Sequence, residues 1–301
     1  MIDYKLLEAL AAVIEQTSFE RAGNCLGLTQ SAVSQRIKLL EARLGQPVLI
    51  RSPALQPTDL GKQLLYHVQQ VQLLEQDLQR RVPILGGSEA RLRIALNADS
   101  MATWWAKAVA SFCREHRTLL DIVIEDQDIG LRRMRDGEVA GCICSSEQSI
   151  QGARSVYLDS ISYRAYACKD YLEQYFPHGV TEKSLASAPA IVFGPHDQLH
   201  ERFMRRAGYD GYFPHHLCPS SEGFVKMVVS GIGYGIMPAI QVAREVQAGE
   251  LVEFAPEYAV DVPLYWHYWR QGGVLLEGIT RQLLSAMPLQ QLLDTAPEGY
   301  Q

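Results

Sequence analysis

Apolar residues near the N-terminus recur every three or four positions and predict a small bundle of helices. The first helix spans Tyr4 to Gln16, and a second begins after Ser18. Gly27 ends the second helix because glycine is costly inside a helix, and Thr29 can cap a third that continues to about Leu44. Two helices joined by so tight a turn predict a helix-turn-helix motif.

The third predicted helix has an apolar stripe from Ala32 to Leu44 on one side and polar side chains on the other. Glutamine and serine side chains can exchange hydrogen bonds with base edges, while basic side chains neutralise phosphates. A short strand at 48–50 and a turn ending at Pro57 predict a wing. The alternative is an ordinary amphipathic helix pair with a solvated polar face. The residues expected to contact DNA are Thr29, Gln30, Ser31, Ser34, Gln35, Arg36, Lys38 and Arg51.

A long helix is predicted from Thr58 to about Arg80, directly after the wing. Two series of residues recur along it every seven positions, as in a coiled coil of about three heptads. They are Leu60, His67 and Leu74, and Leu64, Val71 and Leu78. We expect this helix to pair two chains, because a two-fold operator needs two DNA-reading helices. The alternative is a single amphipathic helix that lies on its own domain.

Beyond a linker at 83–89, short apolar strands alternate with helical segments, which predicts α/β layers with parallel strands. The alternation occurs in two sets, and strands at 162–167 and 264–269 would cross between two lobes around a hinged cleft. The expected fold class is an all-α winged helix-turn-helix N-terminal domain followed by a two-lobed α/β domain. We expect the winged domain at 1–58, a linker and dimerisation helix at 59–87, and the α/β domain at 88–301, with lobe I at about 88–163 and 267–301 and lobe II at about 164–266.

The cleft between such lobes is the expected ligand site, since ligands bind beyond the carboxyl ends of parallel strands. The strand ending at Leu96 leads into Asn97-Ala-Asp-Ser100, which starts a helix whose free N–H groups favour an amino-acid carboxylate. Carboxylates after other strands favour an additional cation, hence lysine or arginine. Each of these carboxylates could equally be a helix cap or a solvated loop end. The residues expected to bind this effector are Asn97, Asp99, Ser100, Met101, Thr103, Asp126, Asp128, Ser145, Asp197 and Glu222.

The charge distribution supports a regulator. The 301-residue chain has a net charge of -6. Residues 28–62 nevertheless carry five basic and two acidic side chains, a local balance of +3. A small basic region attached to an acidic body fits a DNA-binding regulator. The N-terminus has no signal-peptide pattern and the chain has no long apolar stretch, so we expect a cytoplasmic, nucleoid-associated protein that does not interact with membranes.

No catalytic or cofactor motif is present, so we expect no enzyme, no catalytic residues and no cofactor other than the effector. The glycines at 231–235 lie after a helix and before a strand, which reverses the order of the dinucleotide fingerprint. The six cysteines lack paired metal spacing and are expected to be buried small residues, with a redox or metal role for Cys142 and Cys144 as the alternative. We expect no metal at His196 and His200 either.

Several strings of the sequence resemble the LysR-type transcriptional regulators. In the N-terminal part they are Phe19-Glu-Arg-Ala22, Thr29-Gln-Ser-Ala-Val-Ser34-Gln-Arg-Ile37 and Pro57-Thr58-Asp-Leu-Gly61. In the second lobe, the string from Val228 to Pro238 resembles a signature of the family. The resemblance implies an effector domain similar to periplasmic binding proteins, a homotetramer, and operator DNA and RNA polymerase as partners. The sequence itself supports a homodimer.

Further strings resemble the lysine- and arginine-responsive branch of that family, the LysG/ArgP type. They are Asn97-Ala-Asp-Ser100, Tyr175-Phe-Pro-x-Gly-Val180, Ser220-Ser-Glu-x-Phe-Val225 and Leu264-Tyr-Trp-His267. This resemblance implies control of a basic amino-acid exporter gene, and the branch includes a member described as an inhibitor of chromosome initiation. The alternative function is therefore an architectural or replication-origin DNA-binding protein without a small-molecule effector.

Overall fold

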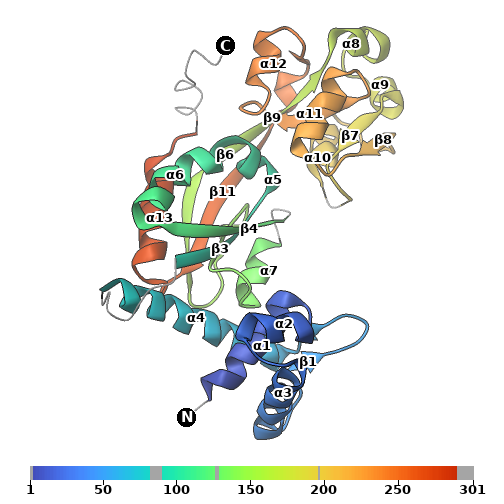
Figure 1. Ribbon diagram of the computed structural model, residues 1–301. Helices are drawn as coiled ribbons and strands as arrows, with labels where there is room; N and C mark the ends of the chain where they lie inside the picture. The colour runs from blue at the N-terminus through green and yellow to red at the C-terminus, as the bar shows by residue number, and fades with distance from the viewer. Residues whose placement is uncertain (1–2, 82–89, 126–128, 196, 290–301) are drawn as a thin grey trace.

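The computed structural model describes residues 3–81, 90–125, 129–195 and 197–289. Figure 1 shows a small helical domain at one end, a long helix α4 beside it, and an α/β body with two lobes. Lobe I lies next to α4, and lobe II lies at the far end of the molecule. This is the winged helix-turn-helix and two-lobed α/β architecture that the sequence predicts. None of the described helices is long and apolar enough to cross a bilayer.

The N-terminal domain packs α1 (Tyr4–Gln16), α2 (Phe19–Leu26) and α3 (Gln30–Leu44) around one apolar core. The N-cap side chains predicted from the sequence both function: Ser18 accepts a hydrogen bond from the N–H of Arg21, and Thr29 accepts one from that of Ala32. Gly27 ends α2 with a φ of 65°, a left-handed conformation that glycine adopts without strain. The wing is a two-stranded ladder of β1 (Leu49–Ile50) and β2 (Gln56–Pro57).

Helix α4 (Asp59–Arg81) belongs to two cores at once. Leu64, Leu65 and Val68 are buried in the core of the N-terminal domain, whereas Leu73 is buried in the core of the α/β body. Leu74 and Leu78 are each 52% exposed. The heptad residues thus differ along the helix. The chain's own N-terminal domain covers those in the first part, and those in the last part are exposed. Pairing of two chains through Leu74 and Leu78 stays a prediction.

One continuous mixed sheet runs through both lobes. Its strand order is β4-β3-β5-β11-β6-β9-β7-β8, with β10 paired to β6. Lobe I contributes β3 (Ala90–Leu96), β4 (Thr118–Ile124) and β5 (Gly141–Cys144), which are parallel. Lobe II contributes β7 (Ala190–Val192), β8 (His215–Leu217), β9 (Tyr234–Pro238) and β10 (Val252–Glu253).

Two long antiparallel strands, β6 (Ala153–Ala167) and β11 (Val260–Trp269), join the lobes. Both cross where the sequence predicts, and both begin earlier than predicted. Their ladder extends from the pair Val260 and Tyr163 to the pair Trp269 and Ala153. The crossing strands therefore connect the lobes through one ladder, with a register shift between Leu264 and Tyr265.

Helices cover the sheet in both lobes. In lobe I, α5 (Ala98–Ser100), η2 (Met101–Trp105) and α6 (Ala106–His116) follow one another directly, α13 (Gly273–Ser285) packs beside α6, and α7 (Gly130–Arg135) packs on β3 and β5. Lobe II has α8 (Lys169–Tyr175), α9 (Glu182–Ser187), α10 (Leu199–Arg206), α11 (Ser221–Val229), α12 (Ala243–Gln247) and η3 (Pro256–Tyr258). The sequence pattern missed α8, α9 and α12, which have at most seven residues and so little periodicity to detect.

Candidate DNA-binding and effector sites

The start of α3 presents the polar side chains that the sequence predicts for DNA contact. Gln30, Ser31, Gln35 and Lys38 are exposed, and Ser34 is half-buried. Thr29 caps the helix, and its hydroxyl lies 3.0 Å from that of Ser31. The residues that can exchange hydrogen bonds with bases thus share one side of the first turns of α3, as in a recognition helix.

Two arginines predicted to contact DNA also support the domain itself. Arg36 is half-buried, and its Nη1 donates to the backbone oxygen of Lys5 on α1 at 3.4 Å. Arg51 at the wing lies 3.6 Å from a carboxylate oxygen of Glu41 and 5.6 Å above the ring of Phe19. The guanidinium of Arg51 is therefore held in place beside the helix pair, with its side chain 48% exposed.

Asn97, just before α5, and Ser100, the last residue of α5, have polar side chains without hydrogen-bond partners among the described residues. Asn97 has the extended backbone of an N-cap, yet its side chain makes no capping bond. Asn97 is 5% exposed and Ser100 is completely buried. Within the described residues, the Asn97 amide atoms and the Ser100 hydroxyl have no hydrogen-bond partner. Buried polar groups are nearly always paired, so this end of lobe I is suited to a polar ligand.

Asp99 is the residue at which both lobes and a crossing strand meet. The hydroxyl of Tyr163 on β6 donates to Asp99 Oδ2 at 2.8 Å. The pKa of the Asp99 carboxyl is raised to about 6, mainly by loss of solvation. Within this net shift the charge of Asp197 from lobe II also raises the pKa, while the hydroxyls of Tyr163 and Ser221 lower it. Two carboxyl groups from opposite lobes therefore act on each other electrostatically, an arrangement that favours a bound cation.

Asp197 serves two purposes in this arrangement. Its Oδ2 accepts from the N–H of Phe193 at 3.2 Å, and its Oδ1 accepts from that of Leu199 at 2.9 Å. These bonds fix the carboxylate at the start of α10. Asp197 precedes the N-cap Gln198 of α10 and binds the first N–H of that helix, in addition to its electrostatic effect on Asp99.

The structure gives the other predicted effector residues surroundings that differ from those of Asp99 and Asp197. Thr103 Oγ1 donates to the backbone oxygen of Asp99 at 2.5 Å, so its hydroxyl is used within the helix. Met101 is 40% exposed, and Ser145 follows the end of β5. Glu222 is exposed and pairs with Lys226 at 2.6 Å, which lowers the pKa of Glu222. Asp126 and Asp128 lie outside the described residues.

Tyr163 and Ser221 were not singled out from the sequence, although both act on Asp99. Tyr163 lies within a predicted crossing strand, where an aromatic residue reads as core packing. Ser221 follows the N-cap Ser220 of α11. The sequence contains no signal for either role, because each depends on how distant segments meet.

Comparisons with known proteins agree with this fold. Residues 4–62 match the model of the bacterial regulatory helix-turn-helix protein, lysR family, and residues 85–283 match that of the LysR substrate binding domain. The chain belongs to the LysR family of bacterial transcriptional regulators. Members of this family regulate transcription and are not enzymes, as the sequence predicts.

Relatives within the LysR family match almost the whole chain. A transcriptional regulator from Pseudomonas aeruginosa, named ArgP, is 61% identical over 95% of this chain and 96% of its own length. An ArgP from Vibrio cholerae is 38% identical over 95% of this chain and 99% of its own. The crystal structure of ArgP from Mycobacterium tuberculosis has a TM-score of 0.81 and 33% identity, covering 95% of this chain and 97% of that one.

A second solved structure carries a ligand. Full-length LysG from Corynebacterium glutamicum, with bound effector arginine, has a TM-score of 0.72 and 29% identity. The match covers 95% of this chain and 98% of that chain. The LysR-type regulators most similar in sequence or structure thus include ArgP proteins and an arginine-binding LysG.

Proposed function

We propose that this LysR-type regulator senses a basic amino acid, arginine or lysine, and controls a gene for the export or metabolism of basic amino acids. The observation that carries the proposal is the group around Asp99, where residues of both lobes and a crossing strand meet. The arginine bound to the related LysG supports it. The effector would be the ligand of the cleft, with no further cofactor.

The two ends of such an effector would match the two parts of the site. The side-chain cation would lie near Asp99 and Asp197, where it relieves both the lost solvation and the repulsion of the carboxylates. The α-carboxylate would take hydrogen bonds from the unpartnered groups of Asn97 and Ser100. Asp126, Asp128, Ser145, Met101 and Glu222 stay candidates for binding the effector.

Effector binding would change the population of lobe arrangements. A ligand that contacts both lobes stabilises the arrangement in which it makes all of its contacts, and it shifts the equilibrium by that difference in affinity. In a homodimer or homotetramer, the shift would change the spacing of the α3 helices on a two-fold operator, or their contact with RNA polymerase. Acting on chromosomal promoters, the protein would be found at the nucleoid.

Calorimetric titration of the full chain with each of the twenty amino acids tests the proposal. We expect binding at pH 7.5 of arginine, lysine or both, and of no acidic or apolar amino acid. The variant Asp99→Asn keeps the size of the side chain and should lose at least about tenfold in affinity, since a charge-assisted hydrogen bond becomes a neutral one. Absence of binding to all twenty would favour an architectural or replication-origin DNA-binding protein.

A further inference from the structure

One face of α4 is docked on lobe I by contacts of several kinds. The rings of Tyr66 and Trp269 are 4.5 Å apart, and Trp269 Nε1 donates to Gln69 Oε1 at 3.3 Å. Lys62 Nζ lies 3.3 Å from Asp136 Oδ1, at the end of α7. Gly137 allows the close approach, since a Cβ there would lie 2.5 Å from the backbone nitrogen of Tyr66. The linker helix and lobe I are thus fitted together within one chain.

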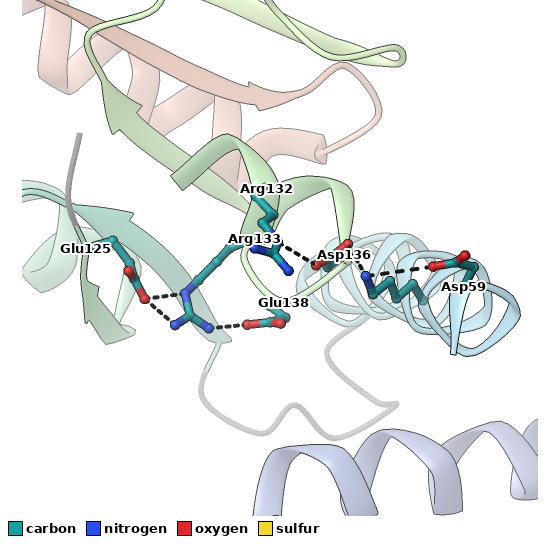
Figure 2. Close-up of polar contacts among 7 residues, drawn as sticks. Asp59, Glu125, Arg132, Arg133, Asp136 and Glu138 are labelled. Atoms are coloured by element: carbon teal, nitrogen blue, oxygen red, sulfur yellow. Dashed lines mark hydrogen bonds and ion pairs between the residues drawn. The ribbon is translucent and has the colours of Figure 1, made fainter. Parts of the chain in front are cut away.

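The short helix α7 makes the polar part of this docking surface. Asp136 follows directly after α7 and receives Lys62, with Arg132 3.9 Å away on its other side. Figure 2 shows the carboxylate of Asp136 between Arg132 and the lysine that also reaches Asp59. The position of Asp136, and with it the docking of α4, therefore depends on how α7 is held.

Arg133 holds α7 from the side that faces away from α4. Its Nε donates to Glu125 Oε1 at 2.5 Å, and its Nη1 donates to Glu138 (Figure 2). Burial alone would lower the pKa of Arg133, but the hydrogen bonds and charges of Glu138 and Glu125 raise it. The side chain of Glu125 is only 15% exposed, so a planar guanidinium that binds two carboxylates is the fitting partner.

Glu125 connects this group to the effector site. It follows β4 directly, and its N–H donates to the backbone oxygen of Leu96 at 3.1 Å. Leu96 is the last residue of β3 and precedes Asn97, whose side-chain amide has no hydrogen-bond partner among the described residues. Contacts from Leu96 to Glu125 and Arg133, helix α7 itself, and the ion pair of Asp136 with Lys62 thus join the proposed effector site to α4.

We propose that α7 couples the effector site to the docking of the linker helix α4, with Arg133 as the positioning residue. The coupling rests on the proposed function, because it needs a ligand near Asn97. A change at the end of β3 moves Glu125, Arg133 turns that movement into a shift of α7, and Asp136 passes it to Lys62. Since such coupling is reciprocal, weakening the docking of α4 also changes the affinity for the effector.

Amide hydrogen exchange of the full chain without ligand tests the first half of this coupling. Arg133 has its ionic partners on lobe I, so Arg133→Met should leave α4 unaffected unless α7 transmits the change. We expect exchange in residues 62–73 to become at least about fivefold faster in Arg133→Met, with strand β3 unchanged as internal reference. Arg133→Lys should restore part of the protection, because lysine keeps the charge and loses the two-sided geometry.

Arg164→Met is the matched control. Arg164 binds Glu253 in lobe II at 3.1 Å, with its side chain 39% exposed compared with 34% for Arg133. This variant also removes an arginine from a carboxylate, and we expect it to leave α4 exchange at the wild-type rate. The proposal fails if Arg133→Met leaves the exchange of α4 unchanged. It fails equally if β3 and α4 are accelerated together, because Arg133 then only stabilises lobe I.

Titration of the same proteins with arginine tests the second half. Lys62→Met lies on α4, away from Asn97, and should shift the arginine Kd by at least about threefold. In the Arg133→Met background, Lys62→Met should add no further shift, since the connection is already broken. An arginine Kd for Lys62→Met within about 1.5-fold of wild type would overturn the coupling. Failure of the wild-type chain to bind arginine or lysine would instead remove the proposed function, and the exchange experiment would still decide the link from α7 to α4.

Discussion

Helix α3, with its candidate DNA contacts, and the proposed effector site around Asp99 are built from the chain in different ways. The candidate DNA contacts from Thr29 to Lys38 follow one another within a single helix and its cap. The effector site takes Asn97, Asp99 and Ser100 from lobe I, Tyr163 from a crossing strand, and Asp197 and Ser221 from lobe II. A surface on one helix is specified by local spacing, whereas the effector site exists only when the lobes are correctly placed.

This difference has a mechanical consequence. The α3 surface moves as one body, because the helix is packed in the core of its domain through Val33, Ile37 and Leu40. The proposed effector site would change if the lobes rotated about β6 and β11, because its residues come from both lobes. A regulator needs both properties, since the DNA-reading surface must keep its shape while the sensor alters the position of that surface. Changes at each site should therefore have separable effects.

Among these changes, Ser100→Leu is expected to separate effector binding from DNA binding most strongly. Ser100 is completely buried, so a leucine there fills the place of the ligand and removes a free hydroxyl. We expect arginine affinity to fall by more than about 100-fold, in line with the cost of about 1–3 kcal/mol for overpacking added to the lost hydrogen bond. DNA affinity without effector should stay within about twofold. Calorimetry and fluorescence anisotropy on the same preparation measure the two values.

The control for that variant is Ser100→Ala, which removes the hydroxyl without adding volume. Its arginine affinity should fall by about tenfold, the value of one hydrogen bond. A Ser100→Leu protein that binds arginine as well as wild type would move the effector site to another part of the molecule.

Gln35→Ala on α3 should have the opposite effect and change DNA recognition without changing effector binding. Loss of a bidentate contact should reduce discrimination between operator and altered bases by about 1–3 kcal/mol, with arginine affinity unchanged. Selection of binding sequences by the wild type and the variant measures this directly. Lys38→Ala is the comparison, because a phosphate contact weakens binding to all sequences and reduces the salt dependence. Unchanged base preference in Gln35→Ala would show that this face of α3 does not read the bases.

A smaller effect is expected from pH, and only at the effector site. The pKa of Asp99 is raised from 3.8 to about 6, and a cation requires the charged carboxylate. Arginine affinity should therefore be constant above about pH 7 and fall by about tenfold between pH 7 and pH 5. Titrations in buffers of different ionisation enthalpy near pH 6 should show release of a proton on binding.

The same pKa shift makes the stability of the ligand-free protein depend on pH. Because the folded state holds the Asp99 proton more tightly than the unfolded state, this group stabilises the empty protein below about pH 4 and loses that contribution as the pH rises through about 6. Asp99→Asn should abolish both pH dependences. A wild-type affinity for arginine that stays flat from pH 7 to pH 5 would contradict the assignment of Asp99 to the cation.

The smallest effect is expected for Thr29→Ala at the start of α3. The Thr29 hydroxyl accepts from the N–H of Ala32, and loss of an N-cap lowers the free energy of unfolding by about 1 kcal/mol. Chemical denaturation of the N-terminal transition measures this change, and the transition of the α/β body should not move. Thr29→Ser keeps the cap and serves as control. Equal stability of the alanine and serine variants would mean that the cap does not support α3.

The sequence by itself determined the elements that depend on neighbours in the chain. The caps at Ser18 and Thr29, the turn at Gly27 and the alternation of strands and helices beyond residue 89 all express local rules, and the structure contains them. Short helices such as α12 were not predicted, because five residues make less than two helical turns and show little periodicity.

Only the tertiary structure decided which polar residues meet. In the sequence, Glu222 and Asp197 are equivalent candidates for binding the effector. In the structure, Glu222 is exposed and paired with Lys226, whereas the charge of Asp197 acts on Asp99. The tertiary structure also brought Tyr163 and Ser221 to the site, and it buried Leu64 of the α4 heptads in the N-terminal core while leaving Leu74 and Leu78 exposed. The physical reason is that desolvation and the interaction of charges depend on distances between segments far apart in the chain, and these distances follow from packing rather than from spacing along it.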